Sequence, residues 1–200
     1  FPSEAGIEFA LRALNDAGVP WLYTAGNHDW HYEGLPGTET ALREEWTRRR
    51  LLPLYQGCNP LSYSVNRNGL EILMIDNSTN EILPEQLAFF REKAASGAPL
   101  LLVLHVPVYV PGRDIFFSCG NPDWRAANDP YWQIERRPRW PENGHSETTM
   151  TFWRELFSMK RPPVVIAGHT HRFSLDCFRG VTQLVAPCNS AGEYLELRFS

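Results

Sequence analysis

Hydrophobic residues recur along the chain at two different spacings, which predict alternating helices and strands. Near the amino terminus Ile7, Ala10, Leu11 and Leu14 lie at helical spacing behind Ser3, a residue type typical of helix caps. Further helices are predicted over residues 38–50, 84–96 and 147–160. Shorter apolar runs predict strands over residues 21–24, 61–65, 70–75, 100–104, 163–167, 173–178, 181–185 and 194–199. This alternation indicates an α/β (α+β) protein with a sheet flanked by helices.

The chain is predicted to form one domain over residues 1–200. It has no internal repeat and no linker, and 200 residues suit one domain of ordinary size. The stretch 111–146 stands apart, because it holds five prolines and six large aromatic residues with little periodicity. A long ordered stretch of this kind in a compact domain is usually functional. We therefore expect a lid-like insertion there.

Composition and charge exclude several classes of protein. The chain is 43% hydrophobic and 21% charged, which is typical of a globular protein and not of a disordered one. The net charge of -4 leaves no basic field for a nucleic-acid partner. No apolar run approaches the roughly 18 residues of a membrane segment. The four cysteines contain no CxxC pair, which argues against a cysteine zinc site.

Three of the apolar runs end directly in residues that bind metals. Residues 21–25 lead to Asn27 and His28, residues 100–104 lead to His105, and residues 164–167 lead to His169 and His171. The carboxyl ends of parallel strands meet at one edge of a sheet, where ligands bind. We therefore expect these side chains to lie close together.

The residue types at these strand ends favour a divalent metal. Neutral imidazole binds zinc, iron and related ions, and a side-chain amide oxygen can complete such a site. In extended backbone His169 and His171 would point to the same side and bind one metal or bridge two. Arg113 and Arg125 are candidate phosphate contacts.

The three motifs Gly26-Asn27-His28-Asp29, His105 and Gly168-His169-Thr170-His171 together resemble the calcineurin-like metallophosphoesterase superfamily. The resemblance extends from Pro20 to Phe173. It implies a layered α/β/β/α sandwich with a binuclear centre of manganese, zinc or iron. It also implies hydrolysis of small-molecule phosphate mono- or diesters by a metal-activated water.

The resemblance also implies roles for single residues. Asn27, His105 and His169 correspond to ligands of one metal, and His171 corresponds to a ligand of the other. His28 corresponds to the histidine that faces the substrate phosphate and assists the leaving group.

Two upstream motifs of the superfamily, an Asp-x-His and a Gly-Asp, have no counterpart in their proper place. We therefore expect an amino-terminally incomplete fragment that lacks the first strand-helix units, binds one metal well and is a poor catalyst. The alternatives are a descendant that has lost one metal position and a non-catalytic metal-binding recognition module. A protein serine/threonine phosphatase is disfavoured by Asp29, where that subgroup usually has Glu, and a nuclease by the acidic charge balance.

Overall fold

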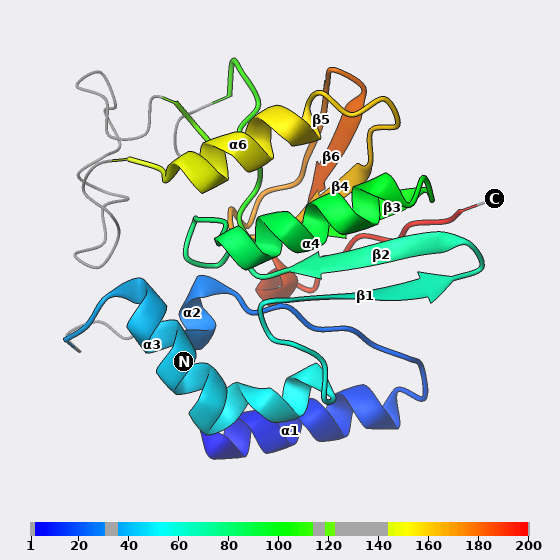
Figure 1. Cartoon of the computed structure of the whole chain (residues 1–200). Helices are drawn as coiled ribbons and strands as arrows, with labels where there is room; N and C mark the ends of the chain where they lie inside the picture. Colours follow the sequence, from blue (N-terminus) through cyan, green and yellow to red (C-terminus); the bar gives the residue numbers. More distant parts are fainter. Residues whose placement is uncertain (1–2, 31–35, 114–118, 123–143, 200) are drawn as a thin grey trace.

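The computed structural model describes residues 3–30, 36–113, 119–122 and 144–199, and most of the expected lid over residues 111–146 lies outside these ranges. Figure 1 shows a sheet with helices on both sides. The helical elements are α1 (Glu4–Asp16), α2 (Asn27–Trp30), α3 (Glu39–Trp46), η1 (Thr47–Leu51), η2 (Leu52–Tyr55), α4 (Pro84–Ala95), α6 (Glu147–Leu156) and η3 (Asn189–Ala191). The strands are β1 (Ser62–Arg67), β2 (Leu70–Ile75), β3 (Leu100–Val103), β4 (Val164–Ala167), β5 (Ser174–Phe178) and β6 (Val181–Val185).

Three helices in the described part of the chain begin at side-chain caps. The hydroxyls of Ser3, Thr38 and Ser146 accept hydrogen bonds from the first-turn amides of α1, α3 and α6 at 3.0–3.2 Å. Such caps satisfy amides that would otherwise have no partner in the helix. The helices predicted from the sequence are present, although the one predicted over 147–160 ends at Leu156 and the one predicted over 38–50 continues from α3 into η1. No helix in the described part of the chain is long and apolar enough to cross a membrane.

The described strands form one mixed sheet of six strands in the order β1-β2-β3-β4-β6-β5. β1 and β2 are the antiparallel hairpin expected from the sequence, and β5 and β6 form a second antiparallel pair. The central pairs β2–β3, β3–β4 and β4–β6 are parallel. α4 connects β2 to β3, and α6 precedes β4, so β3 and β4 end at the same edge of the sheet.

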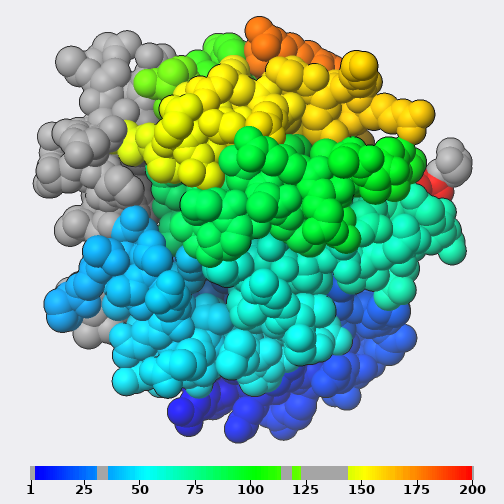
Figure 2. Space-filling model, viewed as in Figure 1, coloured from blue at the N-terminus to red at the C-terminus, as the bar shows by residue number. Residues whose placement is uncertain are grey.

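Apolar side chains on the two faces of the sheet build two separate cores. Leu73, Leu102 and Val165 point to the core under α4 and α6, where Phe90 and Phe152 meet edge to face. Figure 2 shows α4 (green) and α6 (yellow) as one continuous surface over this face. Met74 and Tyr63 belong to the second core, against α1, α3 and η2. Burial of apolar area on both faces is the main term that stabilises this arrangement.

Two predicted strands are wrong. Residues 21–24 form no strand, because the Tyr63 hydroxyl bonds to the amide and the carbonyl of Tyr23 at 3.0 and 2.8 Å in place of a neighbouring strand. Residues 194–199 form no strand either, and Tyr194 is 78% exposed. Apolar residues in a short run predict a strand, but they do not show whether a neighbouring strand is present to pair with it. The described strands therefore belong to a single mixed sheet flanked by helices.

Candidate metal centre

The ends of β3 and β4 place two of the predicted histidines side by side. The parallel register pairs Val103 with Ile166, so both strands stop at the same level. The Gly168 amide then donates to the His105 carbonyl at 3.0 Å, which ties the two loops together beyond the ladder. As a result the rings of His105 and His169 lie 5.0 Å apart, edge to face.

Asn27 reaches the same place through the turn that precedes α2. A Cβ added to Gly26 would lie 2.9 Å from His105 Cε1, so only glycine allows this close approach. The Asp29 carboxylate accepts hydrogen bonds from the Gly26 amide at 2.8 Å and from the Tyr23 hydroxyl at 2.9 Å. Asp29 thus supports the turn. Gly168 has no such steric need, since its nearest neighbour would be the His105 carbonyl at 4.0 Å.

Three donor atoms converge at this point. Asn27 Oδ1 lies 2.9 Å from His105 Nε2 and 3.2 Å from His169 Nδ1, and the two ring nitrogens lie 3.2 Å apart. Asn27 itself is only 3% exposed. Two ligands bound at right angles to one ion with bonds of about 2.1 Å are about 3.0 Å apart. The triangle of donors therefore has the size of one face of an octahedral metal site.

The donor set fits one divalent ion but no more. An amide oxygen with two imidazoles is a mixed O,N site that suits zinc, iron or manganese. In the described part of the chain no group of three or more His, Cys, Asp or Glu side chains is placed to hold a metal ion by itself. Asn27 therefore supplies the third donor atom beside the two imidazoles, and the donor set contains no carboxylate.

The His105 ring is held in the neutral form that a metal needs. Burial lowers the pKa of His105 to about 3, and repulsion from the neighbouring His169, His28 and His171 acts in the same direction. A neutral imidazole keeps a lone pair available on its ligand nitrogen at neutral pH.

All five predicted site residues line one cavity of about 420 Å³, which also touches Gly26, Asp29 and Asn189. His28 and His171 lie on its exposed rim. His169 and His171 do not have the extended backbone assumed above, because both take left-handed conformations, with φ of 70° and 56°. Two non-glycine residues with positive φ in one short turn are uncommon and are found mostly where geometry is constrained by function.

Asn77 was not recognised from the sequence as part of the site. It is fully buried, and its Oδ1 accepts hydrogen bonds from the amides of His105 and Val106, both at 2.9 Å. Its Nδ2 donates to the Val106 carbonyl at 2.7 Å. Asn77 therefore fixes the backbone of His105 from the neighbouring strand end. Its position two residues after a predicted strand was the available signal.

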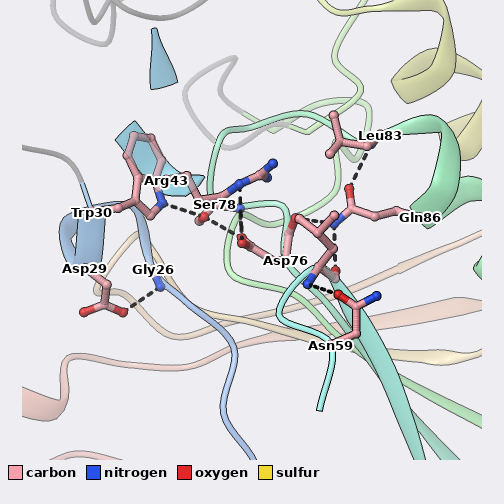
Figure 3. Close-up of polar contacts among 10 residues, drawn as sticks. Gly26, Asp29, Trp30, Arg43, Asn59, Asp76, Ser78, Leu83 and Gln86 are labelled. Atoms are coloured by element: carbon pink, nitrogen blue, oxygen red, sulfur yellow. Dashed lines mark hydrogen bonds and ion pairs between the residues drawn. The ribbon is translucent and has the colours of Figure 1, made fainter. Parts of the chain in front are cut away.

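Asp76 lies behind the site and does not line the cavity. Its Oδ1 accepts hydrogen bonds from the amide and the hydroxyl of Ser78 at 2.9 and 2.5 Å, and Ser78 in turn accepts from Trp30 of α2 at 2.7 Å (Figure 3). Arg43 Nε is 3.9 Å from Asp76 Oδ2. Burial raises the pKa of Asp76, while Arg43 and Ser78 oppose this. This buried network connects α2, and with it Asn27, to the end of β2.

The two arginines considered as phosphate contacts have different outcomes. Arg113 Nε donates to Asp176 Oδ1 at 2.6 Å and forms an ion pair with the same carboxylate, away from the histidines. Arg125 lies outside the described residues.

The geometry describes an α/β protein with a candidate metal site at the carboxyl edge of its sheet. A family model of calcineurin-like phosphoesterases matches residues 2–173. The chain therefore belongs to the calcineurin-like phosphoesterase family, as the three motifs predicted.

One solved structure supports the fold. The structure is similar to a dimetal phosphatase from Danio rerio with a TM-score of 0.55 and 12% sequence identity, covering 92% of this chain and 67% of that one. It also matches a putative 5'-nucleotidase from Staphylococcus aureus, in complex with alpha-ketoglutarate, with a TM-score of 0.46, 13% identity, and coverage of 92% and 35%. A search of curated proteins found no match.

Proposed function

We propose that this protein is a metal-dependent hydrolase that cleaves phosphate mono- or diesters with a metal-activated water. The observation that carries the proposal is the triangle of Asn27 Oδ1, His105 Nε2 and His169 Nδ1, with sides of 2.9–3.2 Å. Family membership, which covers residues 2–173, supports the same chemistry. A bound divalent ion would neutralise phosphate oxygens and acidify a water molecule.

Residues of this chain are assigned to metal binding and to protonation of the leaving group. Asn27, His105 and His169 hold the ion, and the low pKa of His105 keeps that ring unprotonated over the neutral range. His28 lines the same cavity from its exposed rim and is assigned to donate a hydrogen bond or a proton to the departing oxygen. General acid catalysis of this kind contributes roughly 10²–10⁴ in rate.

The second metal position implied by the resemblance has fewer candidate ligands than the first. His171 is the predicted ligand there, and it lies on the exposed turn that follows His169. The nearby carboxylate of Asp29 is occupied by two hydrogen bonds at 2.8 and 2.9 Å. We therefore expect this chain to bind one ion well and to be a weak catalyst. The lid over residues 111–146 and the two-sheet sandwich stay predictions.

A metal-binding recognition module without catalysis is the second candidate. The observation that favours it is the donor set itself, because an amide and two imidazoles bring no carboxylate to bridge a second ion.

One experiment separates the two functions. The chain is titrated with Mn²⁺, Zn²⁺ or Fe²⁺, and the loaded protein is assayed with 4-nitrophenyl phosphate and bis(4-nitrophenyl) phosphate beside an Asn27→Ala variant. Hydrolysis that needs the metal and disappears in the variant supports the enzyme. Tight binding without turnover of either ester supports the recognition module. Failure to bind any of the three ions contradicts both.

A further inference from the structure

A second cavity, of about 240 Å³, adjoins the metal site along the turn after β4. Residues of this turn alternate between the two cavities: His169 and His171 line the metal-site cavity, whereas Thr170 and Arg172 line the second one. The opposite wall of the second cavity comes from the loop after β3, which begins next to His105. The turn thus separates the two cavities, which share no lining residue, and the second cavity is one turn away from the candidate metal site.

The second cavity has a mixed lining, of which one part is apolar. Pro107, Val108, Val110 and Val185 form its floor, and Phe173 stands at its rim with 58% of its surface exposed. An exposed phenyl ring offers a flat face to a ligand ring. A cavity of roughly 150 Å³ already holds one benzene ring, so this one has room for a ring with a short substituent.

Most polar groups of the lining are already paired within the protein. Gln183 bonds to the amide and the carbonyl of Val108 at 2.8 and 3.0 Å. Asp176 pairs with Arg113 and accepts from Ser174 at 3.2 Å. The Thr170 hydroxyl donates to the Arg172 carbonyl at 3.2 Å.

The Arg172 guanidinium is different from these groups. Among the residues that the structure describes, none forms an ion pair or hydrogen bond with its side chain, and Arg172 is exposed at the cavity. Arg113 and Asp176, the other charged lining residues, neutralise each other. The cavity thus offers one available positive charge beside an apolar floor. Guanidinium binds carboxylate and phosphate groups in a planar, two-pronged geometry.

We propose that this cavity binds the alcohol part of the substrate, and that the substrate class is a phosphate ester whose alcohol carries an apolar or aromatic body and a second anionic group. Arg172 pairs with that anionic group, and Phe173 and the valine floor contact the apolar body. This inference rests on the proposed function, and it makes Arg172 a specificity-determining residue of the same site.

The test uses two aryl phosphates that differ in one charge, 4-carboxyphenyl phosphate and 4-carbamoylphenyl phosphate. The measured quantity is the ratio of their kcat/KM values in the Mn²⁺-loaded full chain. We expect Arg172→Gln to lower the carboxyl-to-carbamoyl ratio about tenfold, as suits loss of one charge-assisted hydrogen-bonded pair. Arg172→Lys should restore part of it. The matched control is Arg67→Gln, an exposed arginine on β1, which should leave the ratio unchanged.

Other outcomes overturn the inference. A carboxyl-to-carbamoyl ratio that is the same in wild type and Arg172→Gln contradicts the inference. If kcat/KM falls equally for both substrates while the ratio stays the same, Arg172 contacts the scissile phosphate instead. If neither ester is turned over, the proposed function fails, and binding decides the inference separately. In that case 4-hydroxybenzoate, but not 4-hydroxybenzamide, should shift the amide resonances of Thr170 and Phe173 in wild type and not in Arg172→Gln. Equal shifts by both compounds would overturn it.

Discussion

The inner and outer halves of the metal-site cavity are built in different ways. The inner half is the donor triangle of Asn27, His105 and His169, whose atoms lie 2.9–3.2 Å apart. The outer half holds His28 and His171, both exposed on the rim. Asn27 and His28 share the short helix α2, and His169 and His171 share one turn, so the two halves differ in burial: the inner side chains are buried or half-buried, and the outer ones are exposed. Preorganised ligands bind a metal more tightly, because less freedom is lost on binding.

Removal of an inner ligand should have the largest effect. We expect His105→Ala to weaken Mn²⁺ binding by about 100-fold or more. Loss of a residue that only hydrogen-bonds to a metal ligand already lowers the affinity by about 10–100-fold, and loss of the ligand itself should lower it at least as much. Isothermal titration of wild type and variant measures the change. An affinity within threefold of wild type would show that His105 is no ligand.

Removal of the Asn77 contacts should have the next largest effect. Asn77→Ala leaves the amides of His105 and Val106 without their partner, so we expect a loss of about 3 kcal/mol in the free energy of unfolding. The affinity for Mn²⁺ should fall by about tenfold, because the His105 backbone is no longer held in place.

The matched control is Asn59→Ala, which removes an exposed side-chain bond to the Leu61 amide away from the cavity. It should change the metal affinity little. If Asn77→Ala were destabilised but bound Mn²⁺ as tightly as wild type, Asn77 would be structural only and would not position His105.

The sequence predicted this inner half better than the fold around it. The sequence marks the three inner residues because each follows an apolar run, namely Asn27, His105 and His169. This signal was useful even where the run is not a strand, as for residues 21–24 before Asn27. The missing information was non-local. Nothing in residues 21–24 reveals that the Tyr63 hydroxyl, 40 positions away, takes the place of a neighbouring strand. Likewise, the left-handed backbone of His169 and His171 depends on tertiary constraints that oppose local preference.

The buried state of His105 should appear in the pH dependence of stability. The folded chain keeps this ring neutral down to about pH 3, whereas the unfolded chain takes up a proton near the ordinary pKa of 6.5. The contribution of His105 is therefore unaffected above about pH 6.5, and stability falls as the pH drops from there toward 3, by up to about 1.4 kcal/mol per pH unit.

Urea unfolding of the metal-free chain at about pH 7 and about pH 5 measures this effect. Wild type should lose about 2 kcal/mol more than His105→Gln between the two conditions. Equal losses in both proteins would mean that the ring titrates normally and is not held neutral by its surroundings.

The outer half should give the smallest change. We expect His171→Ala to alter the affinity for the first Mn²⁺ by less than about threefold, because this side chain lies outside the donor triangle and on the exposed rim. A loss as large as that of His105→Ala would remove the distinction between the two halves.

The number of ions that the chain holds tightly decides whether its site is built for a single metal. The metal-free chain is titrated with Mn²⁺ and Zn²⁺ by calorimetry, and the product is checked by elemental analysis after gel filtration. The account predicts one tightly held ion per chain, which is lost in both Asn27→Ala and His169→Ala. Two tightly held ions, or one ion that both variants retain, would contradict it.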